Sequence, residues 1–365
     1  MKENLPKNGP RSFRTLIAVA LSVAIGLTLL GLAARGLDFD RVTDYVAQMD
    51  PSHAAVALGA YAAMFGVVHL LRMWRWFYLL KHLGDFPMSS VMRAGAVGFA
   101  AIILLPLRLG EFVRPYVLAR DTGCSMSSAL GTAVVERVVD GLFISLLLFL
   151  TLATYEGRQS TTFAMVLGWM SLAIFVGALS VLVLGMWRRA LTLKLVEAIF
   201  ARFSAGLASR VVGLLEAFLD GVQSLRHGRS LAAFLVLTLS YWVVNGLSIA
   251  FLASYGFGLD LGAWAGMTVL AILVVGIMIP TGPAMAGNYE LFALEALALF
   301  IAPAQVKVEG VAFVASLHAV QFFVQTLPGV LLVWRRKDSV MGLRREAEAA
   351  LTAQKPGRPG QSDFR

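Results

Sequence analysis

The chain has 365 residues, of which 58% are hydrophobic and 15% charged, and its formal net charge is +9. A soluble domain carries about 45–50% apolar and about 25% charged residues, so this composition excludes an ordinary soluble globular protein. Basic residues gather at the N-terminus, around 72–93, around 188–229 and from 335 onward. Because these clusters flank apolar runs, they indicate positive-inside bias rather than a surface for nucleic acid. We therefore predict a multi-pass membrane protein with both termini in the cytoplasm and no nucleic-acid partner.

Apolar runs of membrane-spanning size follow one another along the chain. A spanning helix needs about 20 mostly apolar residues. Runs of that size lie near 15–34, 54–80, 126–154, 161–186, 231–254, 263–301 and 308–334. One membrane domain over 15–337 therefore fills most of the length, after a short cytoplasmic segment over 1–14. A cleaved signal peptide is the alternative for the first run, but the run is long for one and more membrane segments follow it.

The 94–120 segment begins and ends on the same side of the membrane. Arg93 lies inside by the charge rule, and the 126–154 run also has to start inside if the later crossings are to agree with the charges. The apolar pieces on either side of Pro106 and Gly110 are too short to span at about 1.5 Å per residue. This segment therefore predicts a re-entrant hairpin that enters from the cytoplasm.

The 263–303 segment likewise begins and ends on one side, the outer one, and is interrupted around Pro280, Pro283 and Gly287. Its arms are longer, so two full spans are an alternative to a second re-entrant hairpin. We predict an all-α polytopic membrane protein with about six to eight transmembrane helices and one or two re-entrant broken hairpins. Broken elements that enter from opposite faces also predict an inverted repeat, the plan of many transporters.

Two polar segments complete the predicted organisation. Within 190–228, apolar residues recur at steps of three and four, which is typical of an amphipathic helix on the inner leaflet. A small cytosolic helical hairpin is the alternative. The tail over 338–365 is basic and is predicted to be disordered, with its charges near anionic headgroups.

Charged residues also lie where lipid is expected. Each charge at a helix centre costs about 2.5–3.5 kcal/mol on insertion scales, so seven exposed to lipid would cost on the order of 20 kcal/mol. They must therefore face one another or water. The seven are Arg108, Glu111, Arg114, Glu136, Arg137, Asp140 and Glu290.

Two interpretations of this charged set remain open. Three arginines and four carboxylates nearly cancel, so the set could be an ion-pair cluster that pins the first hairpin to the next span. Buried ion pairs, however, stabilise poorly compared with apolar packing. The other interpretation is a hydrated cavity for a lipid headgroup, in which arginines contact phosphate and carboxylates orient the arginines or meet a cationic group.

The interruptions add unpaired backbone groups to this region. Pro106 and Gly110 break the first segment, and Pro280, Pro283 and Gly287 break the second. Such backbone is tolerated at membrane depth only where protein or water satisfies it. A half-helix that begins after a break would favour an anion at its N-terminus.

Other polar residues in apolar runs are weaker candidates. Three side chains share a face near the inner end of the second run, and we interpret them as snorkelling to the interface; they are His69, Arg72 and Arg75. Another three share a face of the last run and either line the same cavity or bond between helices; they are His318, Gln321 and Gln325.

The remaining marker residues suggest an interface and no redox or metal chemistry. We interpret Trp74, Trp76, Trp187 and Trp334 as interface anchors. Cys124 is the single cysteine, which excludes an intrachain disulfide. Histidine and carboxylate spacing indicates no metal site, and we expect no cofactor.

The charged segments resemble a known family. PLRLGEFVRPYVLAR, which begins at Pro106, and ALGTAVVERVVDGLF, which contains Glu136, Arg137 and Asp140, are similar to the first signature of the lysylphosphatidylglycerol synthase transmembrane-region family, also called flippase-like domain proteins. PTGPAMAGNYE resembles the later proline- and glycine-rich element of that family. Ala284 departs from the glycine expected after the second proline.

The resemblance implies a bacterial inner-membrane protein of the kind that moves lipids between leaflets. In the bifunctional synthetases of this family, a similar domain is fused to a cytosolic aminoacyl-transferring domain. We find no room for such a domain after Lys337, so we do not expect this chain to lysylate lipid. Some related proteins without that domain are linked to glycolipid, polyprenyl-lipid or hopanoid pathways.

Three functions follow as hypotheses. The first is a flippase-like protein that binds and translocates a phospholipid, glycolipid or polyprenyl-linked lipid. The second is an intramembrane enzyme that modifies such a lipid, with carboxylates in acid–base roles. The third is a non-catalytic membrane partner of an enzyme of lipid or glycan biosynthesis.

Overall fold

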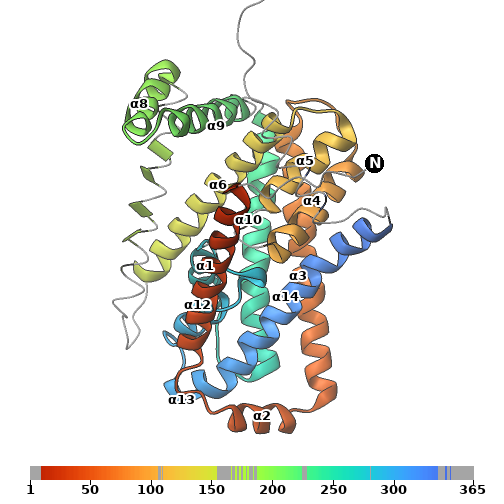
Figure 1. Ribbon diagram of the computed structural model, residues 1–365. Coiled ribbons are helices and arrows are strands. Elements are labelled where there is room, and N and C mark those ends of the chain that lie inside the picture. Colours follow the sequence, from red (N-terminus) through yellow and green to blue (C-terminus); the bar gives the residue numbers. More distant parts are fainter. Residues whose placement is uncertain are drawn as a thin grey trace, which may run out of the picture.

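The computed structural model describes residues 10–105, 108, 110–153, 188–223, 228–279 and 281–335, with isolated positions within 166–187 and at 342 and 346. Every regular element in these residues is helical (Figure 1), which confirms the all-α prediction. Pro106, Pro280, most of the 161–186 run and the tail over 338–365 lie outside the described residues, as do the predictions made for them.

Three of the described helical stretches are long and apolar enough to cross a membrane: Pro51–Leu80, Gly228–Gly256 and Pro303–Arg335. The elements in chain order are α1 (Pro10–Ala33), α2 (Phe39–Gln48), α3 (Pro51–Leu80), α4 (Met88–Leu104), α5 (Gly110–Thr122), α6 (Met126–Ala153), α8 (Arg189–Ala201), α9 (Ala205–Gln223), α10 (Gly228–Phe251), η3 (Leu252–Gly256), α11 (Ala263–Ile277), η4 (Pro283–Met285), α12 (Asn288–Leu297), α13 (Pro303–Gln305), η5 (Val306–Gly310) and α14 (Val311–Arg335).

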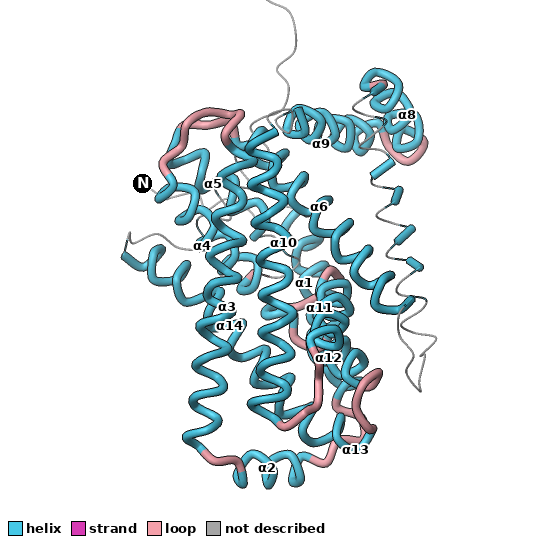
Figure 2. The backbone as a smooth tube through the Cα atoms, turned by 180° about the vertical axis from the view of Figure 1, so that it is seen from behind, coloured by secondary structure: helices cyan, strands magenta, loops and turns pink. Residues whose placement is uncertain are grey.

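The long helices run between two ends of a bundle. α8 and α9 lie across one end, here called the α9 face, and α2 and α13 lie at the other, the α2 face (Figures 1 and 2). α3 and α10 pack side by side along the bundle, and α14 packs against both α3 and α4. Most of the larger apolar core lies among α3, α10, α14 and the short helices α11 and α12.

Local sequence signals set the boundaries at the α2 face. Asp50 caps α3 by accepting a hydrogen bond from the Ser52 amide at 2.9 Å, and Pro51 occupies the first helical position, where its missing N–H costs nothing. α2 is strongly amphipathic and begins at a similar aspartate cap. Its Tyr45 hydroxyl donates to the Phe257 carbonyl at 2.9 Å, which ties α2 to the residue that follows η3.

α4 and α5 form the predicted re-entrant hairpin from the α9 face. Arg93 near the start of α4 forms an ion pair with Asp121 near the end of α5, so both outer ends lie at one face. The 13 residues of α5 reach about 20 Å, which is short of a bilayer core of about 30 Å. The two helices pack tightly, because a Cβ on Gly110 would lie 2.1 Å from the Ile102 amide nitrogen.

α11 and α12 form a second broken hairpin, which approaches from the α2 face (Figure 2). They contain 15 and 10 residues, about 22 Å and 15 Å, so neither can span. The structure therefore decides for a re-entrant hairpin over two full spans. Opposed hairpins are necessary for an inverted repeat but not sufficient, so that repeat stays a prediction.

Asn288 holds the second break together from its centre. Its fully buried side-chain amide donates to the carbonyls of Gly276 and Ile279, both at 3.1 Å, and its carbonyl accepts from the Thr281 hydroxyl at 2.8 Å. One amide side chain thus satisfies the backbone that α11 exposes where it ends, as non-helical backbone at membrane depth requires.

The 190–228 segment contains two helices that lie across the α9 face (Figure 1). α9 packs against α6 and α8, and α8 buries only Thr192. Leu191, Leu195 and Ile199 are exposed on α8. Their placement is the one that an amphipathic helix at a membrane surface would need, and attachment to the inner leaflet stays a prediction.

Candidate ligand-binding cavity

A cavity of about 500 Å³ lies where the tips of the two hairpins meet. Its walls come from both tips and from α3, α6, α10 and α14, which are far apart in the sequence. Small-molecule sites typically occupy about 300–1,000 Å³. Polar residues in its lining are Arg72, Arg108, Glu111, Arg137, Asp140, Tyr241, Asn245, Tyr289, His318, Gln321 and Gln325.

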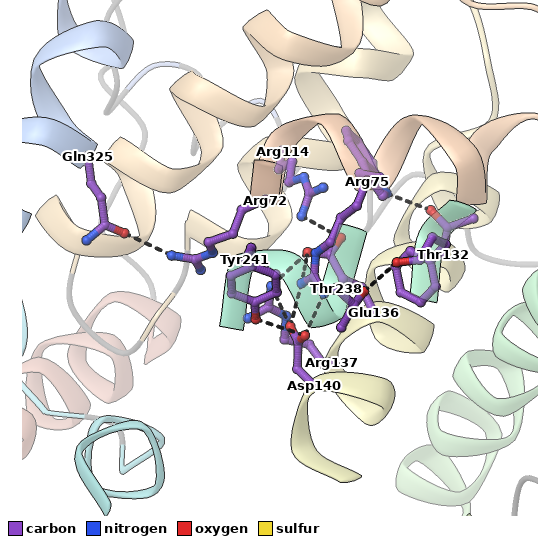
Figure 3. Close-up of polar contacts among 12 residues, drawn as sticks. Arg72, Arg75, Arg114, Thr132, Glu136, Arg137, Asp140, Thr238, Tyr241 and Gln325 are labelled. Carbon is purple, nitrogen blue, oxygen red and sulfur yellow. Dashed lines mark hydrogen bonds and ion pairs between the residues drawn. The ribbon is translucent and has the colours of Figure 1, made fainter. Parts of the chain in front are cut away.

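Arg75 is the centre of the polar network beside the cavity (Figure 3). Its Nη1 and Nη2 donate to Asp140 Oδ1 and Oδ2, both at 2.6 Å, in the two-pronged geometry that guanidinium and carboxylate favour. Nη2 also donates to Glu136 Oε1 at 2.9 Å, and Nη1 to the Thr238 hydroxyl at 3.1 Å. Because Arg75 and Glu136 are both fully buried, this guanidinium neutralises a carboxylate that is shielded from solvent, and it also engages Asp140 at the edge of the cavity.

Two further arginines share the same carboxylates. Arg114 Nη1 lies 2.9 Å from Glu136 Oε2, and Arg137 Nη2 lies 3.1 Å from Glu136 Oε1 and 3.7 Å from Asp140 Oδ2. Tyr241 donates its hydroxyl to Asp140 Oδ1 at 3.0 Å. These contacts join the first hairpin to α6 and α10, so the structural ion-pair interpretation describes this part of the charged set.

The structure overturns our interpretation of the polar residues on α3. We expected His69, Arg72 and Arg75 to reach the interface, but His69 and Arg75 are buried and Arg72 lines the cavity. The reason is that α3 continues beyond Arg75 to Leu80, so these three side chains point at α6 and α14 rather than at lipid headgroups.

Trp76 is likewise no interface anchor. It is fully buried instead. Its indole Nε1 donates to the Thr132 hydroxyl at 2.9 Å. The Arg114 guanidinium carbon lies 3.8 Å from the centre of the Trp76 ring, within cation–π distance. The ring therefore helps to hold Arg114 in the first hairpin, next to the carboxylate that neutralises it.

Arg72 and Arg108 bring positive charge to the cavity with little compensation. Arg72 donates to the neutral Gln325 side chain at 3.1 Å and lies over the Phe99 ring at 4.3 Å. No carboxylate in the described part of the chain pairs with it. Arg108 forms a looser pair with Glu111 at 3.3 Å and donates to the Ile277 carbonyl at 3.1 Å, which links the two hairpin tips.

The charge balance of the cavity differs from the one expected. With Arg72 and Arg75 included, five arginines stand against four carboxylates, so the predicted set's excess of one carboxylate becomes an excess of one arginine. Asp140 and Glu136 are already engaged by Arg75 from behind. The side chains that remain open toward the cavity therefore favour an anion. The five arginines are Arg72, Arg75, Arg108, Arg114 and Arg137, and the four carboxylates are Glu111, Glu136, Asp140 and Glu290.

The opposite wall is built on the second hairpin and α14. The His318 ring stacks on Tyr289 with centroids 4.0 Å apart. Its Nδ1 lies 2.6 Å from Glu290 Oε1, and its Nε2 lies 2.8 Å from the Ala284 carbonyl oxygen. Glu290 Oε2 accepts from the Gly287 amide at 2.7 Å, which closes the start of α12.

The second tip carries backbone strain. Ala284 and Met285 have φ angles of 59° and 58°, in the left-handed region that costs a non-glycine residue about 1–2 kcal/mol. The resemblance led us to expect a glycine at position 284, and the left-handed turn is present with Ala284 there. Gly287 has a φ of 93°, and a Cβ there would lie 2.0 Å from the Gly26 carbonyl oxygen, so α1 approaches the break closely.

The predicted site residues fall into two groups. Arg108, Glu111, Arg137 and Asp140 line the cavity. Arg114 and Glu136 are buried behind that wall, and Glu290 contacts the cavity through His318. Of the predicted break residues, Gly110 and Gly287 lie at close helix contacts and Pro283 begins η4.

Sequence reasoning left several central residues out of the candidate set. Arg75 and Arg72 were visible as charged residues three apart in an apolar run, which was the available signal. His318, Gln321 and Gln325 were noted as one face of α14 with two alternatives, and the structure satisfies both. All three line the cavity, and Gln321 also donates to the Tyr61 hydroxyl at 2.8 Å.

Comparisons with known proteins bear on this architecture. A curated relative from Haloferax volcanii, named glycosyltransferase AglD, is 26% identical over 352 residues, which cover 88% of this chain and 54% of that protein. The chain thus spans about half the length of this relative. No solved structure matches the chain. The family model described as lysylphosphatidylglycerol synthase TM region matches residues 19–329, which include both hairpins and the whole cavity. The chain is therefore a multi-pass membrane protein that belongs to the lysylphosphatidylglycerol synthase TM region family.

Proposed function

We propose that this protein binds a polar lipid by an anionic, phosphate-bearing headgroup in the cavity and translocates it between leaflets. The observation that carries the proposal is the surplus of arginine side chains at a cavity built from two opposed broken hairpins. Arginine recognises phosphate through paired N–H donors. A cavity of about 500 Å³ is large enough for a headgroup, while the acyl or prenyl tails remain in the bilayer.

The charged residues then have three roles: headgroup contact, orientation of the contacting arginines, and structural support. Arg72, Arg108 and Arg137 contact the headgroup. Glu111 orients Arg108, and Asp140, three residues along α6, orients Arg137. Arg75, Arg114 and Glu136 form the support that keeps these groups in place, while Glu290 orients His318 on the opposite wall.

The two tips also suggest how passage would occur. The first hairpin reaches the cavity from the α9 face and the second from the α2 face, and Arg108 joins them by its bond to Ile277. Movement of one tip at a time would open the cavity to one leaflet at a time, as alternating access requires. We assign the α9 face to the cytoplasm, because the basic clusters around 72–93 and 188–229 lie at that face in the described residues. The charge pattern of the sequence would place both termini on the same side, in a bacterial cytoplasmic membrane.

Reconstituted vesicles test the proposal. Purified protein in liposomes that contain a fluorescent anionic phospholipid is expected to move the label between leaflets. Arg72→Gln should lower that rate by about tenfold, because a hydrogen bond to a charged group contributes about 1.5–3 kcal/mol. Arg41→Gln, which changes an exposed arginine on α2, should move lipid at the wild-type rate. Equal rates for protein-containing and empty liposomes would refute translocation.

A second candidate function rests on the named relative. Because that protein is called a glycosyltransferase, this chain would serve an enzyme of lipid-linked glycan synthesis as a membrane partner, holding the lipid carrier by its phosphate. Lipid binding without lipid movement in the vesicle experiment, together with co-purification of a glycan-forming enzyme, would favour this function over translocation.

A further inference from the structure

The contacts of His318 fix how many protons its site holds. Nε2 faces the Ala284 carbonyl oxygen at 2.8 Å, and a carbonyl oxygen can only accept, so Nε2 carries a proton. Nδ1 faces Glu290 Oε1 at 2.6 Å. If that carboxylate is ionised, Nδ1 must also carry a proton. If Nδ1 is bare, Glu290 must be the donor.

In one case His318 carries two protons and Glu290 is ionised; in the other His318 is neutral and Glu290 is protonated. In either case the pair holds one proton more than a neutral histidine beside an ionised glutamate. Glu290 Oε2 cannot take that proton without losing its own bond, because it already accepts from the Gly287 amide at 2.7 Å. The proton therefore lies between His318 Nδ1 and Glu290 Oε1. We propose that His318 and Glu290 form a proton-binding site that holds the tip of the second hairpin in place while the proton is bound.

Removal of the proton has a defined structural consequence. The neutral ring then has one N–H for two acceptors, so it keeps either the Glu290 contact or the Ala284 contact. The Ala284 carbonyl belongs to η4, whose left-handed backbone at Ala284 and Met285 needs outside support. Met285 lines the cavity and packs beside the core around Phe99 and Ile102 on α4, so the tip that would be released touches the first hairpin.

Other groups near His318 do not replace this pair. Tyr289 stacks on the ring from α12, and Tyr61 of α3 bonds to Gln321 one turn further along α14. α11 has no titratable side chain, and neither has α1 from 19 to 33. The other charged groups in the cavity lining lie on α3, α6 and the first hairpin; they are Arg72, Arg108, Glu111, Arg137 and Asp140.

The proton would also alter the attraction of the cavity for an anion. With the proton bound, the His318–Glu290 pair is neutral and the surplus of arginine charge stands alone. Without it, the pair adds a negative charge to the same cavity. Deprotonation would thus loosen a tip and weaken headgroup binding together. This coupling to lipid rests on the proposed function, whereas the proton site itself does not.

Hydrogen–deuterium exchange of the 281–287 segment, in detergent from about pH 5 to about pH 9, tests the proton site. Glu290→Gln provides the informative variant. Its amide N–H₂ would donate to Nδ1 and its oxygen would accept from Gly287, so both ring contacts persist with no labile proton. At low pH, wild type and Glu290→Gln should exchange alike. At high pH, wild type should exchange about tenfold faster, the factor expected from loss of one charge-assisted hydrogen bond.

His318→Phe supplies the opposite limit, since phenylalanine keeps the stack on Tyr289 and loses both hydrogen bonds. Its tip should exchange fast at every pH relative to Glu290→Gln at the same pH, a comparison that cancels the intrinsic pH dependence of exchange. If wild type and Glu290→Gln exchange alike over the whole pH range, the proton site is wrong, whether or not the protein moves lipid. Loss of lipid movement with the pH step intact would refute only the transport proposal.

Discussion

At the scale of single residues, Arg75 separates stability from binding. It joins Asp140, Glu136 and Thr238 without reaching the cavity lining, whereas Arg72, one turn earlier on the same helix, lines the cavity and has only neutral partners. Two arginines three residues apart thus have different roles, because Arg72 lines the cavity and Arg75 is buried behind its wall. Their spacing in the sequence showed that they share a face of α3 but could not show which one reaches the cavity.

Arg75→Met should therefore destabilise the protein strongly. Removal of one partner from a buried ion pair costs about 3–5 kcal/mol, and here it leaves Glu136 and Asp140 with only Arg114 and Arg137 to compensate their charge. The thermal unfolding midpoint in detergent should fall accordingly. Arg72→Met is the matched control, since it removes the same charge one turn away and leaves no buried carboxylate unpaired. Similar midpoints for the two variants would contradict the assignment of Arg75 as the centre of the network.

At the scale of elements, the hairpins were predictable and their contacts were not. The number of crossings required 94–120 and 263–303 each to return to its own side, and α4–α5 and α11–α12 do so. The arm lengths of the second segment left two full spans open, because apolar composition does not mark where α11 ends. Asn288, which satisfies the carbonyls at that point, carried no signal in the sequence beyond its place among glycines and prolines.

The close packing of α4 on α5 gives an element-scale prediction. Gly110→Ala would place a methyl group 2.1 Å from the Ile102 nitrogen and 2.2 Å from the Ala101 carbonyl carbon, which are backbone atoms that cannot turn aside. The hairpin should open or unfold locally, with faster hydrogen exchange over α4 and α5 and a loss of stability of about 1–3 kcal/mol. Gly59→Ala on α3 has no atom within 4 Å of the new methyl group, so it should leave the exchange of α4 and α5 unchanged and should not lower stability. An unaltered exchange pattern for Gly110→Ala would contradict the close contact between α4 and α5 at Gly110.

At the scale of the whole molecule, the sequence predicted that buried charges converge, and the structure shows what they converge with. All seven predicted charges lie at or next to one cavity, because their helices cannot present them to lipid at an acceptable cost. The surplus of positive charge was missed, since it comes from Arg72 and Arg75 on a helix whose polar face looked like an interfacial one. Burial depth along a spanning helix depends on its neighbours, and a single sequence does not specify those neighbours.

The central claim is that this positively charged cavity holds a phosphate-bearing lipid headgroup. Native mass spectrometry of the protein, purified from its own membrane and compared with Arg72→Gln and with the exposed-site control Arg41→Gln, measures this most directly. Wild type and Arg41→Gln should retain a phosphate-containing lipid, and Arg72→Gln should retain about tenfold less of it. Equal retention by wild type and Arg72→Gln, or retention of uncharged lipid alone, would contradict the claim.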